Sequence, residues 1–274
     1  TELLAEQHYV SLRGWLQPLG IEVAWLAGKV TGRARSRALE AIADGRAQLV
    51  VGTHALMQEG VSFHRLGLAI VDEQHRFGVH QRLALRDKGG DGGLVPHQLV
   101  MTATPIPRTL AMSAYADLDV SAIDELPPGR TPVQTVVLSG ERRPELVQRI
   151  RAACSEGRQA YWVCTLIDDS DEVVAQAAQS TFEALRDALP GIEVGLVHGR
   201  MKPAEKQAVM RAFKEGALGL LVATTVIEVG VDVPNASLMI VENAERLGLA
   251  QLHQLRGRVG RGAAASTCVL LYQP

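Results

Sequence analysis

Short apolar runs of strand length recur along the whole chain, and segments of helical periodicity lie between most of them. The apolar runs occupy residues 21–26, 48–51, 66–71, 98–103, 133–138, 160–164, 192–197, 218–223, 238–241 and 267–271. Amphipathic helices are predicted over residues 3–16, 33–43, 141–155, 171–189 and 203–214. Continuously apolar strands separated by such helices are typical of parallel sheets covered on both faces. The pattern therefore predicts an α/β fold.

The length of 274 residues suits two α/β domains, each of about 100–150 residues. Residues 118–131 interrupt the alternation with two prolines and a glycine, and we place a linker there. The first domain is then 1–117 and the second 132–274. A glycine-rich stretch at 88–93 lacks a following Lys-Ser/Thr pair, so we interpret it as a surface loop.

An acidic pair, Asp72 and Glu73, directly follows the apolar run at 66–71. Open α/β sheets bind ligands at the carboxyl ends of their strands. Asp72 could hold Mg²⁺ through water there, and Glu73 could polarise an attacking water. Taken alone, however, an acidic pair after a strand is more typical of a helix N-cap.

Two arginines three residues apart, Arg258 and Arg261, lie in the segment 254–261 near the end of the chain. They share a face if the segment is helical, and their guanidinium groups match phosphate oxygens. Gly257 and Gly260 would let that face approach closely. A solvated basic helix end is the alternative, but the spacing of the whole segment argues against it.

Short polar turns follow several other strands and offer hydroxyl, imidazole and guanidinium groups to phosphates. Each turn is weak evidence by itself, because capped turns and structural histidines are common. These candidates are Thr53 and His54, Thr102 and Thr104, His198 and Arg200, Thr224, and Gly230 with Asp232.

Composition narrows the function classes. Net charge is only −2 and aromatic residues make up 4%, so any nucleic-acid surface is a local patch that contacts the backbone rather than stacking on bases. The three cysteines are isolated, which indicates neither a disulfide framework nor a zinc site and fits a reducing cytosol. No apolar run approaches the length of a membrane span.

The motifs, taken in order, resemble those of superfamily 2 helicases, and three longer strings resemble the RecG family of bacterial fork-remodelling helicases. These strings occupy residues 72–79, 101–109 and 248–261. The transcription-repair coupling factor is a rival, although it normally has Glu where this chain has Gln74. A nucleic-acid-binding module that hydrolyses no nucleotide is a rival from another class. Two positions depart from the family, Thr165 for proline and Leu247 for phenylalanine.

The resemblance implies two RecA-like domains that use ATP and Mg²⁺. Asp72 would hold the metal, Glu73 would be the catalytic base, and His75 and Gln254 would link hydrolysis to DNA. The residues implied at the nucleotide are Arg258, Arg261, Gly230 and Asp232. Those implied at DNA are Thr53, His54, Thr102, Thr104, His198, Arg200 and Thr224.

The resemblance also implies partners and a location. They are duplex and branched DNA, a contact of the parent protein with single-stranded DNA-binding protein, a monomeric state and the bacterial cytoplasm at the nucleoid. The phosphate loop G-x-x-x-x-G-K-[ST] is absent from the sequence. We therefore expect a first domain that is incomplete at its N-terminus, and a chain that hydrolyses little ATP by itself.

Overall fold

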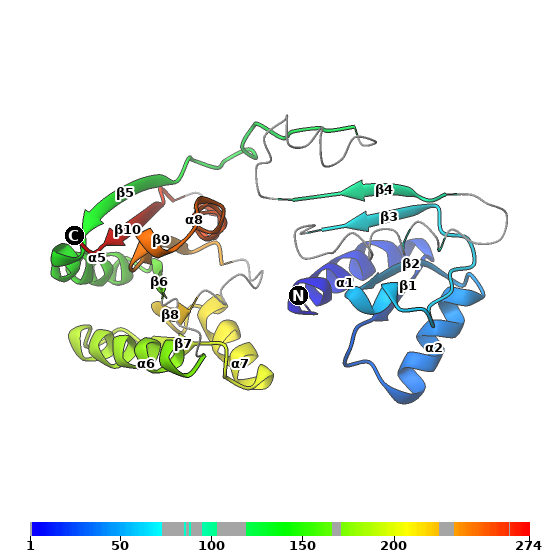
Figure 1. The fold of residues 1–274 in the computed structure, drawn as a ribbon, viewed down its shortest axis with the longest axis horizontal. Helices are drawn as coiled ribbons and strands as arrows, with labels where there is room; N and C mark the ends of the chain where they lie inside the picture. Colours follow the sequence, from blue (N-terminus) through cyan, green and yellow to red (C-terminus); the bar gives the residue numbers. More distant parts are fainter. Residues whose placement is uncertain are drawn as a thin grey trace. The chain divides into compact units, whose positions relative to one another are not determined.

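The structure is a computed structural model, and it describes residues 2–72, 85, 88, 95–102, 119–165, 171–224, 233–262 and 264–274. The chain divides into two compact units, residues 1–103 and 104–274 (Figure 1). The predicted linker at 118–131 falls within the second unit and stays a prediction.

The second unit contains a six-stranded parallel sheet in the order β5-β10-β9-β6-β8-β7. Its strands are β5 (Gln134–Ser139), β6 (Gln159–Cys164), β7 (Val194–Val197), β8 (Leu220–Thr224), β9 (Ala236–Val241) and β10 (Thr267–Tyr272). Its helices are α5 (Arg143–Ser155), α6 (Asp171–Ala188), α7 (Pro203–Lys214) and α8 (Leu249–Arg256), with short 3-10 turns η4 (Gly140–Arg142) and η6 (Ala244–Arg246).

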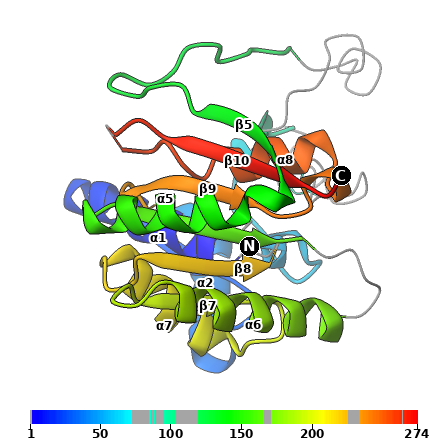
Figure 2. The ribbon, with the colours of Figure 1, turned by 90° about the vertical axis from the view of Figure 1, so that its left-hand side faces the viewer.

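Successive side chains of a strand point to opposite faces of the sheet. Apolar residues on both faces of this sheet are covered by helices. Trp162 belongs to the core on the face that α5 and α6 cover, together with Ile150 and Leu185 (Figure 2). Its neighbour Tyr161 contacts Phe213 of α7, with the ring centroids 4.9 Å apart. Every residue of β6 and β8 is buried, as expected for central strands of a parallel sheet.

The first unit contains two separate parallel pairs of strands. In the first pair, β1 (Glu22–Leu26) lies beside β2 (Ala47–Gly52), and helices α1 (Glu2–Leu16) and α2 (Gly32–Ala43) contact both strands. In the second pair, β3 (Leu68–Val71) lies beside β4 (His97–Val100). Short 3-10 turns η1 (Gln17–Leu19) and η2 (His54–Met57) complete the elements described in this unit.

The second pair of strands buries only one of its faces. Ala69 and Val71 of β3 form a small core with Leu85, whereas Leu68 and Ile70 are 54% and 56% exposed. The alternation of buried and exposed positions is that of a strand with one covered face.

These elements confirm the predicted α/β fold with parallel sheets. All ten predicted strands and all five predicted helices are present, with ends shifted by a few residues. Pro203 lies in the first turn of α7. The N–H groups of a first turn have no partner within the helix, so the missing N–H of proline removes no helical hydrogen bond there. Helix α8 was not among the predicted helices. Its eight residues are too few to show a clear helical period. None of the described helices has both the length and the apolar character needed to cross a bilayer.

Candidate functional site

Asp72 lies directly after β3, at the carboxyl end of a parallel strand, as predicted. Its carboxylate is 39% exposed, and Oδ2 lies 3.6 Å from Nε2 of His8, which α1 contributes. A partly exposed carboxylate at this edge can hold a hydrated cation. Sequence reasoning missed His8, because only the packing of α1 brings it near β3. Glu73 and His75 lie outside the described residues.

The metal role of Asp72 can be tested against the donors around it. In the part of the chain that is described, no group of three or more His, Cys, Asp or Glu side chains could hold a metal ion. Mg²⁺ commonly takes only one or two carboxylates and completes its shell with water and substrate phosphates. Asp72 is thus one carboxylate of the kind that such a hydrated cation takes.

The turn after β2 is tightly built. A Cβ at Gly52 would lie 2.0 Å from the carbonyl oxygen of Leu26, so only glycine fits there. Thr53 then caps η2, where its Oγ1 accepts a hydrogen bond from the N–H of Ala55 at 3.5 Å. Thr53 thus forms the capped turn that was the alternative to a phosphate-binding role. The hydroxyl hydrogen is still available for a phosphate. Thr102 follows β4, and Thr104 lies outside the described residues.

Lys88 of the glycine-rich stretch donates from Nζ to the carbonyl oxygens of Gln58 and Val61, at 2.8 and 2.6 Å. Partial burial lowers the pKa of this amine. The lysine therefore ties its segment to the residues that follow η2, and these two bonds give it a structural role.

His198 directly follows β7, and Thr224 is the last residue of the adjacent strand β8. Val197 pairs with Ala223 in the register of β7 and β8, so the next residues, His198 and Thr224, lie at the same edge of the sheet. Thr224 Oγ1 and His198 Nδ1 are buried, and neither has a hydrogen-bond partner among the described residues. Buried polar atoms without partners are uncommon, and a bound group could satisfy both.

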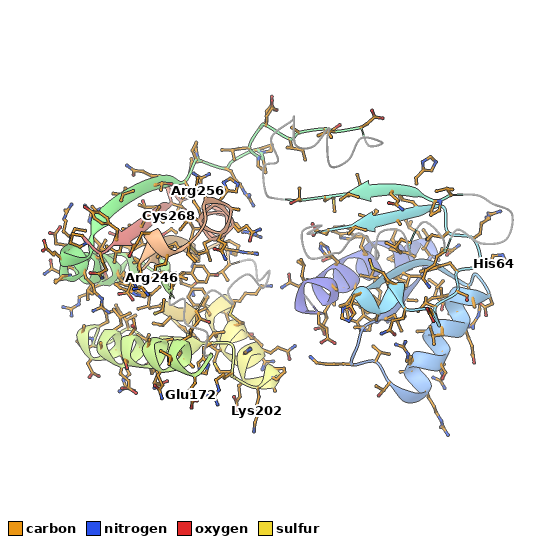
Figure 3. All side chains as sticks on the ribbon, in the orientation of Figure 1. His64, Glu172, Lys202, Arg246, Arg256 and Cys268 are labelled. Carbon is orange, nitrogen blue, oxygen red and sulfur yellow. The ribbon has the colours of Figure 1, made fainter. Side chains whose placement is uncertain are left out.

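Basic side chains surround this edge. Arg200 Nη1 lies 3.3 Å from Glu172 Oε1, and Nζ of Lys206 donates to the carbonyl oxygen of Gly199 at 2.6 Å. Figure 3 shows Glu172 and Lys202 on the side of the unit that carries α6 and α7. Burial, followed by the charges of Lys206 and Arg200, lowers the pKa of His198 and favours its neutral ring. Sequence reasoning missed Lys202 and Lys206, although their spacing across the start of α7 was a usable signal.

Residues 257–261, which contain Arg258 and Arg261, are not helical. This corrects the expectation that the two arginines share a helix face. Helix α8 ends at Arg256, and the N–H groups of Gly257 and Arg258 bond back to the carbonyls of His253 and Leu255. The backbone then leaves the helix, because Gly260 adopts a left-handed conformation with φ of 79°.

Close packing holds the end of this segment in place of helical hydrogen bonds. A Cβ at Gly260 would lie 2.7 Å from Val133 Cγ2, and one at Gly262 would lie 2.4 Å from the carbonyl oxygen of Pro234. A Cβ at Gly257 would meet no atom closer than 3.4 Å, so close approach does not require glycine there. Arg258 and Arg261 are half-buried and each has an interaction partner. Gln254, on α8, is half-buried too.

The remaining predicted nucleotide residues, Gly230 and Asp232, lie outside the described part of the chain. The structure therefore brings His198 and Thr224 together in one unit and places Asp72 in the other.

Comparisons with known proteins bear on the whole chain. The DEAD/DEAH box helicase family matches residues 1–113, and the helicase conserved C-terminal domain matches residues 142–263. The chain is 70% identical over 274 residues to the ATP-dependent DNA helicase RecG of Escherichia coli strain K12, and 69% identical over 275 residues to that of Haemophilus influenzae. All of this chain aligns in both cases, but it spans only 40% of each relative's length.

Solved structures agree with this result. A RecG bound to a three-way DNA junction aligns with all of this chain and 35% of its own, at 44% identity and a TM-score of 0.77. Yeast Dbp5 bound to RNA and ADP BeF3 aligns at a TM-score of 0.67 but only 16% identity, over 100% of this chain and 69% of its own, which supports the fold alone. Because its two halves match the two helicase domains in order and its whole length is about 70% identical to RecG proteins, the chain belongs to the RecG family of ATP-dependent DNA helicases.

Proposed function

We propose that this chain is the motor core of a helicase that uses ATP hydrolysis to translocate on DNA, remodel stalled replication forks and branch-migrate recombination intermediates at the bacterial nucleoid. The observation that carries the proposal is the arginine segment. Arg258 and Arg261 are half-buried, and they lie in a turn of the second unit. In this turn Gly260 closely approaches Val133, and Gly262 closely approaches Pro234. A rigid pair of guanidinium groups suits the charge that develops on a phosphoryl group during transfer.

The proposed roles at the nucleotide are those that the resemblance to the helicase family implies. Asp72 would hold Mg²⁺ through water, and the ion would supply charge neutralisation at the phosphates. Glu73 would orient the attacking water and accept its proton. Arg258 and Arg261 would bind the terminal phosphate most strongly in the transition state. Gly230 and Asp232 are proposed to line the nucleotide.

The proposed DNA contacts are directed at the backbone. The buried hydroxyl of Thr224 and the ring of His198 would meet phosphate oxygens, with Arg200 close by. Thr53, His54, Thr102 and Thr104 would do the same in the first unit, and His75 and Gln254 would link DNA contact to hydrolysis. Because such contacts displace counterions, binding should weaken steeply with salt. Duplex and branched DNA are the partners that this chemistry and the RecG relative bound to a three-way junction support.

The ATPase proposal can be tested in a chimaera in which this chain replaces the matching segment of the Escherichia coli relative. We expect Arg261→Ala to lower the DNA-stimulated kcat by at least about 100-fold with little change in nucleotide affinity, because the group acts in the transition state. Arg211→Ala, at an exposed position on α7, is the control. An equal loss of affinity and turnover would make Arg261 a ground-state ligand. A chimaera without any ATPase activity would favour the non-hydrolysing module.

The chain by itself is proposed to be nearly inactive as an ATPase, with or without DNA, since the sequence holds no phosphate loop. It should also bind fork and linear duplex equally, because backbone contacts carry no junction information. Phosphate release and binding titrations at two salt concentrations test both statements. A tenfold preference for the fork would place junction recognition within these residues.

A further inference from the structure

Thr165, directly after β6, is buried, with 1% of its surface exposed. Its hydroxyl bonds to two backbone carbonyl oxygens, those of Glu242 and Asn243, the latter at 3.0 Å. Both carbonyls belong to the chain that leaves the neighbouring strand β9. A single buried hydroxyl therefore connects the end of β6 to the end of β9.

The backbone that Thr165 contacts is itself unusual. Asn243 has φ of 48° and ψ of 48°, and no other non-glycine residue in the described part of the chain has a positive φ. Asparagine tolerates this left-handed conformation better than most residues, but neighbouring contacts must still hold it there. The bonds from Thr165 fix the peptide groups on each side of the Asn243 Cα. They therefore hold the direction in which the chain leaves the sheet.

A second restraint acts on Glu242. Its N–H donates to the carbonyl of Val163 at 2.9 Å, and its Oε1 lies 2.9 Å from Nε of Arg143. The Arg143 guanidinium in turn lies over the ring of Trp162, 5.0 Å from the centroid. Since Trp162 is fully buried, Arg143 links Glu242 to the core of the sheet.

The helix that follows, α8, buries few of its own residues. Of the eight residues of α8, all of them described, Leu255 alone is buried, and Leu249 is 85% exposed. Its first turn is closed by the Gln251 side chain, whose Oε1 accepts from the N–H of Gly248 at 3.2 Å. In Figure 3, Arg246 marks the turn before α8 and Arg256 the helix end.

We infer that Thr165, assisted by the Arg143–Glu242 pair, is a positioning residue that sets the direction of α8 and so places Gln254, Arg258 and Arg261 for the reaction. The inference rests on the proposed function for its chemical consequence. Its structural part stands on hydrogen bonds within the second unit alone. The close approaches at Gly260 and Gly262 hold the chain after α8, and Thr165 holds the backbone that leads into α8.

The structural part can be tested on the 274-residue chain by hydrogen exchange. Thr165→Val keeps the shape of the side chain and removes the hydroxyl, and we expect amides of residues 243–256 to exchange at least tenfold faster. Thr165→Ser should restore the slow exchange. Ser237→Ala is the matched control, because this buried hydroxyl on β9 has no hydrogen-bond partner among the described residues. If Thr165→Val leaves these amides unchanged, or speeds those of β8 and α7 equally, the inference is wrong.

The functional part needs the chimaera described above. We expect Thr165→Val to lower kcat about tenfold with less than a twofold change in KM for ATP, and Thr165→Ser to recover most of the loss. A purely structural role would lower the fraction of active enzyme and leave kcat per active site unchanged. If exchange responds as expected while Arg261→Ala leaves ATPase activity intact, the proposed function fails and the positioning of α8 still stands. If kcat is unaffected by Thr165→Val, the functional part of the inference is overturned.

Discussion

The two units contain strands of similar apolar sequence, yet they bury them differently. In the second unit β6 and β8 each lie between two neighbouring strands, and all of their residues are buried. In the first unit β3 has one neighbouring strand among the described residues, and its Leu68 and Ile70 are more than half exposed. Apolar sequence alone therefore does not determine how far a strand is buried. Its burial depends on the strands and helices that cover its edges and faces.

The same difference bears on the proposed functional residues of each unit. The arginine segment and the His198–Thr224 edge belong to the unit whose sheet has helices packed on both faces. Asp72 follows a strand of a two-stranded pair. Because the burial of apolar surface is the main source of stability, we expect the second unit to be the more rigid scaffold.

The largest expected effect is in native-state hydrogen exchange, which compares the two units directly. Amides of β6 and β8 should exchange at least roughly 1000-fold more slowly than those of β3 and β4, since protection follows burial and cooperative unfolding. Exchange of the intact chain, read by mass spectrometry of peptides, measures this. Equal protection of β3 and β8 would show that the first unit is as stable as the second.

The next effect comes from a core substitution in each unit. Phe213→Ala should destabilise the second unit by about 3–5 kcal/mol, because the ring is fully buried against Tyr161. Leu68→Ala in the first unit should cost less than about 1 kcal/mol, since the side chain is already more than half exposed. Urea denaturation followed by circular dichroism gives both values. A cost above about 2 kcal/mol for Leu68→Ala would show that this face of β3 is covered in solution.

A smaller effect concerns the arginine turn. Gly260 and Gly216 have nearly the same φ, 79° and 81°, but only a Cβ at Gly260 would meet another side chain, Val133. Both changes to alanine should cost roughly 1 kcal/mol for the backbone strain, and Gly260→Ala should cost about 1–3 kcal/mol more for the clash. Adding Val133→Ala should remove most of the excess. Thermal unfolding of these three variants measures the costs, and equal costs at the two glycines would rule out the close approach.

The smallest effect is a pH dependence confined to the second unit. The pKa of His198 is lowered in the folded state, so the unfolded chain binds a proton more readily. Stability from this group is complete above the ordinary histidine pKa of about 6.5 and declines as pH falls through the lowered native value. His198→Gln should flatten that decline, as measured by urea denaturation between about pH 7.5 and pH 5. An unchanged slope would mean that His198 titrates alike in both states.

Much of the fold could be predicted from the sequence, because the apolar runs report which backbone segments must be buried. The ten strands, the five longer helices and the parallel character of the sheets all follow from that periodicity. Motif order and spacing also placed Asp72 and Thr224 at strand ends, since each follows an apolar run directly.

Only the tertiary structure decided the features that depend on contacts between distant segments. The end of α8 at Arg256 and the left-handed Gly260 removed the helical face expected for Arg258 and Arg261. His8 approaches Asp72, and Thr165 bonds to the turn after β9, across 64 and 77 positions of sequence respectively. Local periodicity determines which segments form strands and helices, whereas a hydrogen bond between two such segments exists only once the sheet order has brought them together.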